Sequence, residues 1–402
     1  MKLPSIIVKP SRQFPFLARH PWVHSSSLAE SKEVYPLGQE VDLVQHDGTW
    51  LARGLYNPSS GLKVRLYSWD RNQNLDTDFF TTKVDQAIAR RRLAGFLPGD
   101  PQATLEGVLT ASRLIFSEAD GLSGLIVDQY ADYLVVQIAA GVIQLRQEAI
   151  LDFLQERLKP QAIFLRTDAK TAQKEGIEQQ EGLVRGTAPE GAILYQQNGL
   201  QLAVDLLHGQ KTGGYLDQRD NHAAAARYLV GRRVLDVCCY AGGFGLVAAA
   251  AGAAHVIGVD SSEKALDLAA ANAARNQLTN LSFEKADCFD YLAKADRPEV
   301  DAVILDPPRF AGSRRQVDAA LRAYTKLNRD AIRGLPAGGI LVTNSCSGSV
   351  SRSDFMNMLV NVGRKENRDI TVLETRTAAA DHPLRISCPE SDYLKCFICE
   401  VQ

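Results

Sequence analysis

The sequence lacks a long hydrophobic run, which excludes a membrane-spanning helix. Its longest weakly polar stretch, residues 245–259, is rich in alanine and glycine and carries His255. Residues 1–10 hold only a short apolar patch broken by Pro4, too short for the core of a signal peptide. We therefore expect a cytoplasmic protein without membrane association.

Cysteine is also scarce, with seven residues in the chain. Without a secretory signal, these cysteines are expected to be reduced thiols. Internal repeats and low-complexity segments are missing, and a hydrophobic content of 45% with 23% charged residues is typical of a folded globular protein. At 402 residues the chain is too long for one ordinary core, so two or three domains are expected.

An excess of charge of one sign is missing too, because the net charge is only −2. Basic residues are nevertheless enriched locally: residues 1–95 hold 13 Lys and Arg against 9 Asp and Glu, and residues 309–333 hold 7 against 2. In the second region the basic residues follow one stripe of a predicted helix. The stripe predicts either a phosphate-binding surface or a solvated helix face. Its members are Arg315, Arg322, Lys326, Arg329 and Arg333.

Three stretches of the chain differ in residue pattern. Short alternating runs separated by Gly, Pro and Asn turns predict a small β domain over 1–75. Residues 76–185 mix predicted strands with helices at 83–93 and 143–157, which indicates a central α+β domain. A hairpin signal over 193–204 then opens a region of strand–helix alternation that extends over 190–402.

This last region predicts a doubly wound α/β sheet. Because ligands bind beyond the carboxyl ends of the strands in such sheets, each predicted strand end is a candidate site. Strands are expected at 233–237, 255–260, 281–286, 302–306 and 340–343, with helices at 263–276 and 316–335.

Acidic residues and glycines follow the first strands. Gly242 and Gly243 would let a ligand approach the backbone closely. Asp236 suits an ammonium group, Asp260 two ribose hydroxyls, and Asp287 an adenine edge. A dinucleotide site is the alternative, but the G-x-G-x-x-G spacing is absent and Asp236 would repel a pyrophosphate. Asp236 could also simply cap a helix. S-adenosylmethionine is therefore the expected cofactor. The neighbouring residues expected in the same site are Cys239, Tyr240, Ser261 and Cys288.

The third strand end carries the turn Asp306-Pro-Pro-Arg-Phe310. Two prolines fix an extended turn that exposes Asp306 and its neighbours. Such a turn suits a flat nucleobase held by its polar edge. The substrate-binding residues predicted here are Pro307, Pro308, Arg309 and Phe310.

Cys346 follows the next predicted strand and stands among Ser and Gly residues. A lone cysteine is most often a small core residue, but this one lies on the ligand side of the sheet. Carbon 5 of cytosine is too electron-poor to accept a methyl group unaided, and a thiolate adding at carbon 6 removes that obstacle. Cys346 is the predicted nucleophile, and Asp306 is predicted to engage N3 and the exocyclic amine. Asp381, His382 and Glu390 are candidates for the base that removes the C5 proton.

Cys396 and Cys399 have the spacing of half a metal site. They lie, however, in a predicted strand over 393–401, where residues three apart point to opposite faces. No metal is therefore expected.

At these motifs the chain resembles, nearly end to end, the bacterial large-subunit ribosomal RNA cytosine-5 methyltransferase family, type I. The motifs that carry the resemblance are Gly209–Arg219, Tyr240–Phe244, Asp306–Phe310, Ser345–Gly348, Asp381–Pro383 and Pro389–Lys395.

The resemblance implies a PUA-like RNA-binding domain over 1–75, the central domain over 76–185, and a class I, Rossmann-like methyltransferase domain over 190–402. It implies Cys346 as nucleophile, acidic residues at the cofactor, and large-subunit ribosomal RNA as partner. A homodimer is left open. The segment that would cover the cofactor or base contains Lys211, Tyr215, Asp217, Gln218 and Arg219.

Two departures bear on function. The loop His20-Pro-Trp-Val-His24 lacks the aromatic residue and glycine that usually follow in the family. Arg309 stands where another family of RNA cytosine-5 methyltransferases has a second cysteine, so release must use another base. Two alternatives remain: a methyltransferase for an exocyclic amine or another RNA, and an RNA-binding protein with a vestigial catalytic domain. In the first, an aromatic residue usually follows the prolines and Cys346 has no role.

Overall fold

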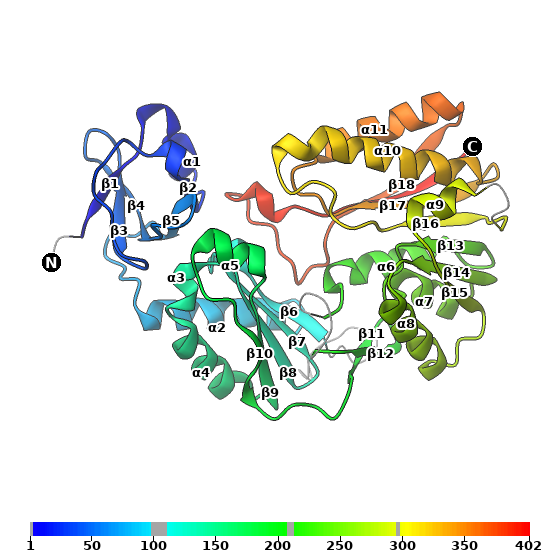
Figure 1. Cartoon of the computed structure of the whole chain (residues 1–402), viewed down its shortest axis with the longest axis horizontal. Helices are drawn as coiled ribbons and strands as arrows, with labels where there is room; N and C mark the ends of the chain where they lie inside the picture. Colours follow the sequence, from blue (N-terminus) through cyan, green and yellow to red (C-terminus); the bar gives the residue numbers. More distant parts are fainter. Residues whose placement is uncertain (1–2, 98–110, 207–212, 295–297) are drawn as a thin grey trace. The chain divides into compact units, whose positions relative to one another are not determined.

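The computed structural model describes residues 3–97, 111–206, 213–294 and 298–402. The chain divides into two compact units (Figure 1). The first unit consists of Met1–Tyr195, Val204–Gly213 and Asp381–Ser391, and the second of Gln196–Ala203, Gly214–Ala380 and Asp392–Gln402. Neither unit is one continuous stretch of chain. No helix in the described part of the chain is both long and apolar enough to cross a bilayer.

A five-stranded sheet forms the N-terminal part of the first unit, with strand order β1-β3-β4-β5-β2. Alternation of apolar residues places Val41, Leu43, Val64 and Leu66 in its core, each at most 2% exposed. This confirms the small β domain predicted from the residue pattern. The elements are β1 (Ser5–Ile7), α1 (Phe14–Leu17), β2 (Trp22–His24), β3 (Glu40–Val44), β4 (Trp50–Tyr56) and β5 (Leu62–Ser68).

A second five-stranded sheet, ordered β10-β9-β8-β7-β6, completes the first unit with its helices. The helix predicted at 83–93 begins earlier, because the Asp76 side chain accepts a hydrogen bond from the backbone of Phe79 and caps it. The helix predicted at 143–157 is two helices, since Arg146 has non-helical backbone angles. The elements are α2 (Thr77–Leu93), β6 (Ala111–Phe116), β7 (Leu125–Tyr130), β8 (Tyr133–Ile138), α3 (Gly141–Gln144), α4 (Gln147–Leu158), β9 (Ala162–Arg166), α5 (Ala169–Glu175) and β10 (Glu181–Gly186).

The predicted hairpin forms from β11 (Ile193–Gln197) and β12 (Leu200–Val204). The second unit holds a seven-stranded sheet, ordered β15-β14-β13-β16-β17-β19-β18. Its first five strands are parallel, which confirms the doubly wound architecture. The elements are α6 (Arg219–Ala226), β13 (Arg233–Val237), α7 (Gly243–Ala250), β14 (His255–Asp260), α8 (Glu263–Arg275), β15 (Leu281–Lys285), α9 (Cys288–Ala293), β16 (Ala302–Leu305), α10 (Val317–Arg333), β17 (Gly339–Ser345), α11 (Arg352–Glu366), β18 (Ile370–Arg376) and β19 (Lys395–Val401).

Helices cover both faces of this sheet (Figure 1). Helices α6 and α7 pack on one face, and α9, α10 and α11 pack on the other. Cys396 lies in the core between the sheet and helices α6 and α7. Cys399 lies in the core on the other face, under α9, α10 and α11. The prediction that these two cysteines point to opposite faces is confirmed.

The carboxyl ends of the parallel strands meet at one edge of the sheet. Asp236 of β13 pairs in register with Gly258 of β14 and Ile304 of β16, and Leu305 pairs with Thr343 of β17. The strand ends that the sequence singled out are therefore neighbours in space.

Candidate active site

Asp236 lies at the buried end of β13 and is 1% exposed. Its Oδ2 accepts a hydrogen bond of 2.8 Å from the backbone of Gly245, so the residue does cap α7. Its Oδ1 is buried and has no hydrogen-bond partner in the described part of the chain. Burial raises the pKa of Asp236 to about 7. An unpartnered buried oxygen is costly, and a donor from a ligand would satisfy it.

The loop between β13 and α7 has an unusual backbone. Cys238 and Tyr240 adopt positive φ values of 62° and 50°, which non-glycine residues rarely do. Gly242 has φ 83°, and a Cβ added at Gly243 would lie 2.5 Å from the ring of His222. Backbone strain of this kind is concentrated at ligand sites. At Gly243, however, the close neighbour that requires glycine is a side chain of α6.

Asp260 ends β14 and holds the neighbouring loops through both carboxylate oxygens. Its Oδ2 accepts from the backbone of Tyr240 at 2.9 Å, and its Oδ1 accepts from the backbone of Ser262 at 2.9 Å. Each carboxylate oxygen can accept a further hydrogen bond. Asp287 is exposed and caps α9 by accepting from the backbone of Phe289 and Asp290. The cysteines predicted beside these acids differ in burial: Cys239 is buried, whereas Cys288 is partly exposed.

The segment before α6 contacts the turn Asp306–Phe310 that follows β16. Gln218 is 2% exposed, and its Nε2 donates to Oδ1 of Asp306 at 2.9 Å. Tyr215 packs edge-on against Tyr240, with 5.1 Å between ring centroids. Partial burial, reinforced by the nearby Asp306 and Cys346, raises the pKa of Tyr215. These contacts bring together the segment before α6, the loop between β13 and α7, and the turn Asp306–Phe310.

The other residues predicted in the segment before α6 are Asp217, Arg219 and Lys211. The Asp217 carboxylate accepts a hydrogen bond from the Tyr393 hydroxyl. Arg219 is 3% exposed and pairs with Asp220. Lys211 lies outside the described residues.

The turn after β16 is fastened to the loop after β17. Ser347 Oγ accepts from the backbone of Phe310 at 3.2 Å and of Ala311 at 3.0 Å. Arg309 folds back on its own loop, with Nε donating to the carbonyl of Ala311 at 2.8 Å. The Phe310 ring lies 4.8 Å from the ring of Tyr324, centroid to centroid. Asp306 and Cys346 are thus held on two loops that bind each other.

Cys346 is partly exposed, and its Sγ lies 3.8 Å from the carbonyl oxygen of Pro307. The predicted nucleophile and the predicted base-binding turn are therefore in contact.

Lys395 ends the motif Pro389–Lys395 but had no predicted role in the site. It faces Ser345 in the β17–β19 register and is 2% exposed. Its Nζ donates to the carbonyl of Ser347 at 2.7 Å and of Tyr393 at 2.8 Å. Burial lowers the pKa of Lys395 to about 8, against the opposing effect of the nearby Cys346. The sequence signal that could have indicated a role for this residue is a lysine at the start of the largely apolar strand β19.

The candidates for the C5 base lie in the first unit. Asp381 is fully buried and accepts from the backbone of Arg113 and from the His382 ring, each at 2.9 Å. Glu390 accepts from Nε2 of His20 at 3.0 Å, and this hydrogen bond lowers the pKa of Glu390 to about 2. Their roles stay predictions.

Within the described residues, His20, Cys388 and Glu390 bring three possible metal ligands within 4.8 Å of one another. The backbone of Trp22 donates to Nδ1 of His20 at 3.2 Å, so Nε2 carries the proton that faces Glu390. This arrangement favours a hydrogen-bonded pair over a metal site.

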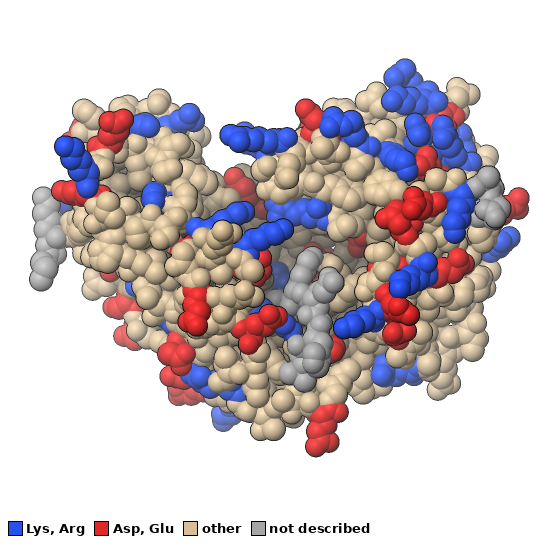
Figure 2. Space-filling view, viewed as in Figure 1, with Lys and Arg blue, Asp and Glu red and all other residues tan. Residues whose placement is uncertain are grey.

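Three of the five residues of the basic stripe, all of them on α10, pair with acids. Arg333 Nε lies 2.6 Å from Glu366, Arg329 Nε lies 3.8 Å from the same carboxylate, and Lys326 Nζ lies 3.6 Å from Asp330. Figure 2 shows acidic side chains among the Lys and Arg side chains over α10 and α11. This pairing favours the solvated helix face.

Two family models match the chain: a PUA-like domain over residues 6–69 and a methyltransferase domain over residues 230–383. Ribosomal RNA large subunit methyltransferase I of Aliivibrio fischeri is 37% identical over 401 residues, which cover 99% of each chain. The protein of the same name from Escherichia coli O139:H28 is 37% identical over 400 residues, 98% of this chain and 99% of that one.

Solved structures show the same fold. One assigned as a methyltransferase complexed with SAH aligns with a TM-score of 0.85 and 20% identity over 99% of this chain and 100% of that chain. One assigned as a SAM-dependent methyltransferase from Streptococcus mutans aligns with a TM-score of 0.83 and 20% identity over the same shares. The predicted fold class is confirmed, and the matches support the predicted S-adenosylmethionine cofactor. At 37% identity over nearly its whole length, the chain belongs to the ribosomal RNA large subunit methyltransferase I family.

Proposed function

We propose that the protein methylates carbon 5 of a cytosine in large-subunit ribosomal RNA, using S-adenosylmethionine and Cys346 as covalent nucleophile. The names of the relatives support the RNA substrate. The observation that carries the mechanism is the contact between Cys346 Sγ and the Pro307 carbonyl, beside Asp306. A cytoplasmic location, where this RNA is found, is part of the proposal.

The residues at the sheet edge fit the cofactor. The partnerless Oδ1 of Asp236 suits the ammonium of its methionine part. The remaining acceptor capacity of Asp260 suits the ribose hydroxyls, and Tyr215 and Tyr240 would lie beside it. When bound, S-adenosylmethionine supplies an electrophilic methyl group.

Covalent catalysis gives Cys346, Asp306 and Lys395 each a role. The Cys346 thiolate forms a bond to carbon 6, and the electrons of the C5–C6 double bond make carbon 5 nucleophilic while Asp306 shares a proton with N3. After carbon 5 has gained the methyl group, a base takes its proton. The electrons of the C5–H bond re-form the C5–C6 double bond, and the bond between sulfur and carbon 6 breaks to release the Cys346 thiolate. The Lys395 ammonium stabilises the Cys346 thiolate before it attacks carbon 6 and again after it is released.

RNA carrying 5-fluorocytosine at the target tests the mechanism. Fluorine cannot leave as a cation, so the methylated adduct should stay bonded to Cys346 and be identified by peptide mass spectrometry. Cys346→Ser should abolish both turnover and adduct, while Cys388→Ser, in the first unit, should retain both. Full activity of Cys346→Ser, or a product methylated on nitrogen, would favour the exocyclic-amine alternative instead.

A further inference from the structure

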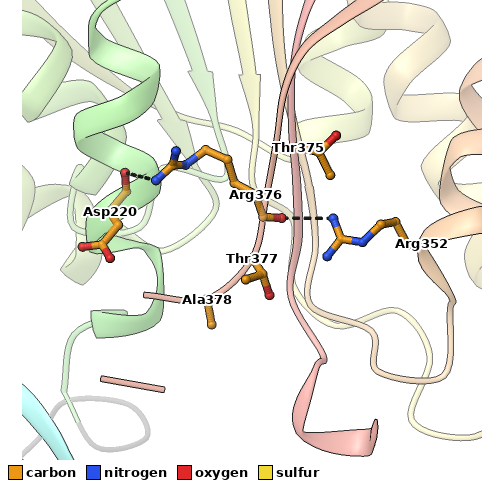
Figure 3. Close-up of a pocket in the computed structure, with 6 residues that line it drawn as sticks. All are labelled: Asp220, Arg352, Thr375, Arg376, Thr377 and Ala378. Atoms are coloured by element: carbon orange, nitrogen blue, oxygen red, sulfur yellow. Dashed lines mark hydrogen bonds between the residues drawn. The ribbon is translucent and has the colours of Figure 1, made fainter. Parts of the chain in front are cut away.

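A polar pocket of about 360 Å³ opens in the second unit where β18 ends (Figure 3). Its volume falls within the range of small-ligand sites, roughly 300–1,000 Å³. It is formed by α6, the start of α11 and the end of β18. The residues that line it are Asp220, Arg352, Thr375, Arg376, Thr377 and Ala378.

Arg352 offers positive charge to this pocket. Its Nη1 donates to the carbonyl of Arg376 at 3.4 Å, and its Nη2 lies 3.8 Å from the Asp392 carboxylate, beyond hydrogen-bond distance. The Arg352 side chain is 34% exposed. Its planar, permanently charged group suits a phosphate.

The opposite side of the pocket offers an acceptor. The Asp220 carboxylate receives contacts of 3.3 Å from Nε of Arg219 and from the backbone of Ala380. These are long hydrogen bonds, and the side chain is 36% exposed. A carboxylate in this setting suits a hydroxyl donor such as the ribose 2′-OH, which distinguishes RNA from DNA.

Arg376 links the pocket to the active site. Figure 3 shows its side chain extending from the end of β18 toward Asp220 and α6. Its Nε donates to Oδ1 of Asn221 at 3.0 Å. Nδ2 of Asn221 donates to Oε1 of Gln218 at 2.6 Å, and Nε2 of Gln218 donates to Asp306 at 2.9 Å.

The direction of this hydrogen-bonded chain is fixed. An arginine can only donate, so Asn221 must turn its oxygen toward Arg376 and its amino group toward Gln218. Gln218 must then turn its own amino group toward Asp306. Asn221 is 0% and Gln218 2% exposed, so water does not compete for these bonds.

We propose that the pocket binds the ribose–phosphate of an RNA nucleotide next to the target base, and that Arg376, Asn221 and Gln218 position Asp306 from it. The proposal rests on the proposed function, in which Asp306 engages the base. Arg352 holds the phosphate, Asp220 reads the 2′-hydroxyl, and Asn221 is a positioning residue.

The binding arm uses large-subunit ribosomal RNA transcript and measures affinity by filter binding over a range of salt. Arg352→Gln should weaken binding about tenfold and lower the salt slope by about 0.7, the value of one single-strand phosphate contact. Arg227→Gln is the matched control for the loss of one positive charge, since Arg227 is an exposed arginine of the same unit that does not line the pocket. Equal slopes for Arg352→Gln and the wild type would overturn the phosphate site.

The ribose arm uses a short oligonucleotide spanning the mapped methylation site. A single 2′-deoxy substitution beside the target should weaken binding to the wild type severalfold. The same substitution should have no further effect on Asp220→Ala, which has no side-chain acceptor. Equal losses in both proteins would overturn the role of Asp220. Because these arms need no turnover, they can succeed even if the 5-fluorocytosine adduct fails to form.

The positioning arm uses Asn221→Asp, which is nearly isosteric. The new carboxylate cannot donate to Gln218, so Gln218 must turn its oxygen toward Asp306. We expect kcat to fall about tenfold at unchanged KM for RNA, and the limb of the pH–kcat profile that Asp306 sets to move to higher pH, because a carboxyl group that faces the Gln218 oxygen holds its proton more tightly. Partial misfolding would lower kcat without moving the profile. An unmoved profile, whatever the loss in kcat, would overturn the positioning role.

Discussion

Asp236 shows how burial can make one residue sensitive to both pH and ligand. Its ordinary pKa of 3.8 is raised to about 7, with burial as the main cause. Between these values the ligand-free folded protein holds a proton that the unfolded chain releases. The contribution of Asp236 to stability is therefore full below pH 3.8 and is lost as the pH rises to about 7. A bound cation reverses the preference, because it favours the ionised carboxylate.

We expect S-adenosylmethionine to bind more tightly as the pH rises through 7, with a proton released from Asp236. Calorimetry in two buffers of different ionisation enthalpy measures that proton. Asp236→Asn should lose about 1.5–3 kcal/mol of binding, the value of a charge-assisted hydrogen bond, together with the pH dependence. A wild-type affinity that is constant between pH 6 and 8 would contradict this assignment.

A second prediction concerns the effect of Lys395 on the reactivity of Cys346. If its ammonium stabilises the Cys346 thiolate, Lys395→Met should move the pH at which half of Cys346 is alkylated by iodoacetamide upward. Reactivity at pH 7 should fall about tenfold for each unit of that displacement. Lys395→Arg keeps the charge and should keep most of the reactivity. Identical alkylation profiles for all three proteins would remove Lys395 from the mechanism.

At the scale of elements, the strand–helix alternation could be predicted because each strand of the parallel sheet is a short apolar run followed by a turn signal. The strands predicted at 233–237 and 255–260 match β13 and β14. The break between α3 and α4 could not be predicted, because it depends on the backbone of Arg146 and not on hydrophobic period. The division at residues 75 and 190 remains a prediction.

Helix α10 allows a test of the basic stripe. Because Arg329 and Arg333 already pair with Glu366, we expect the double substitution Arg329→Gln and Arg333→Gln to leave the salt slope of RNA binding nearly unchanged. Arg352→Gln, measured in parallel, supplies the positive comparison. A slope lowered by about 1.4, as expected for two single-strand phosphate contacts, would establish the stripe as an RNA-binding surface.

For the whole molecule, the sequence indicates the family, the fold class and the main acids of the site. It does not indicate that Gln218 contacts Asp306, or that Lys395 caps the carbonyl after Cys346. These residues are separated by many positions in the chain, and only the folded sheet brings them together. The same holds for Asp381, whose hydrogen bond with the backbone of Arg113 joins residues 268 positions apart.

Asp381→Ala should destabilise the first unit by about 1–3 kcal/mol, because it removes the buried carboxylate that accepts from the part-buried backbone N–H of Arg113. Trp22, Trp50 and Trp69 all belong to this unit, so urea unfolding followed by tryptophan fluorescence reports on it directly. Asp369→Ala, an exposed change in the second unit, is the control. An unchanged midpoint for Asp381→Ala would show that this contact contributes little.

The inclusion of residues 381–391 in the first unit has a consequence for synthesis. On the ribosome, the N-terminal half emerges complete up to Tyr195 but cannot bury Asp381 until nearly the whole chain has been made. At roughly 5–20 residues per second, that delay lasts on the order of 10–40 s. During this interval the backbone of Arg113 lacks its native acceptor. The first unit, whose N-terminal part is made first, is therefore completed only by residues 381–391, which are translated late.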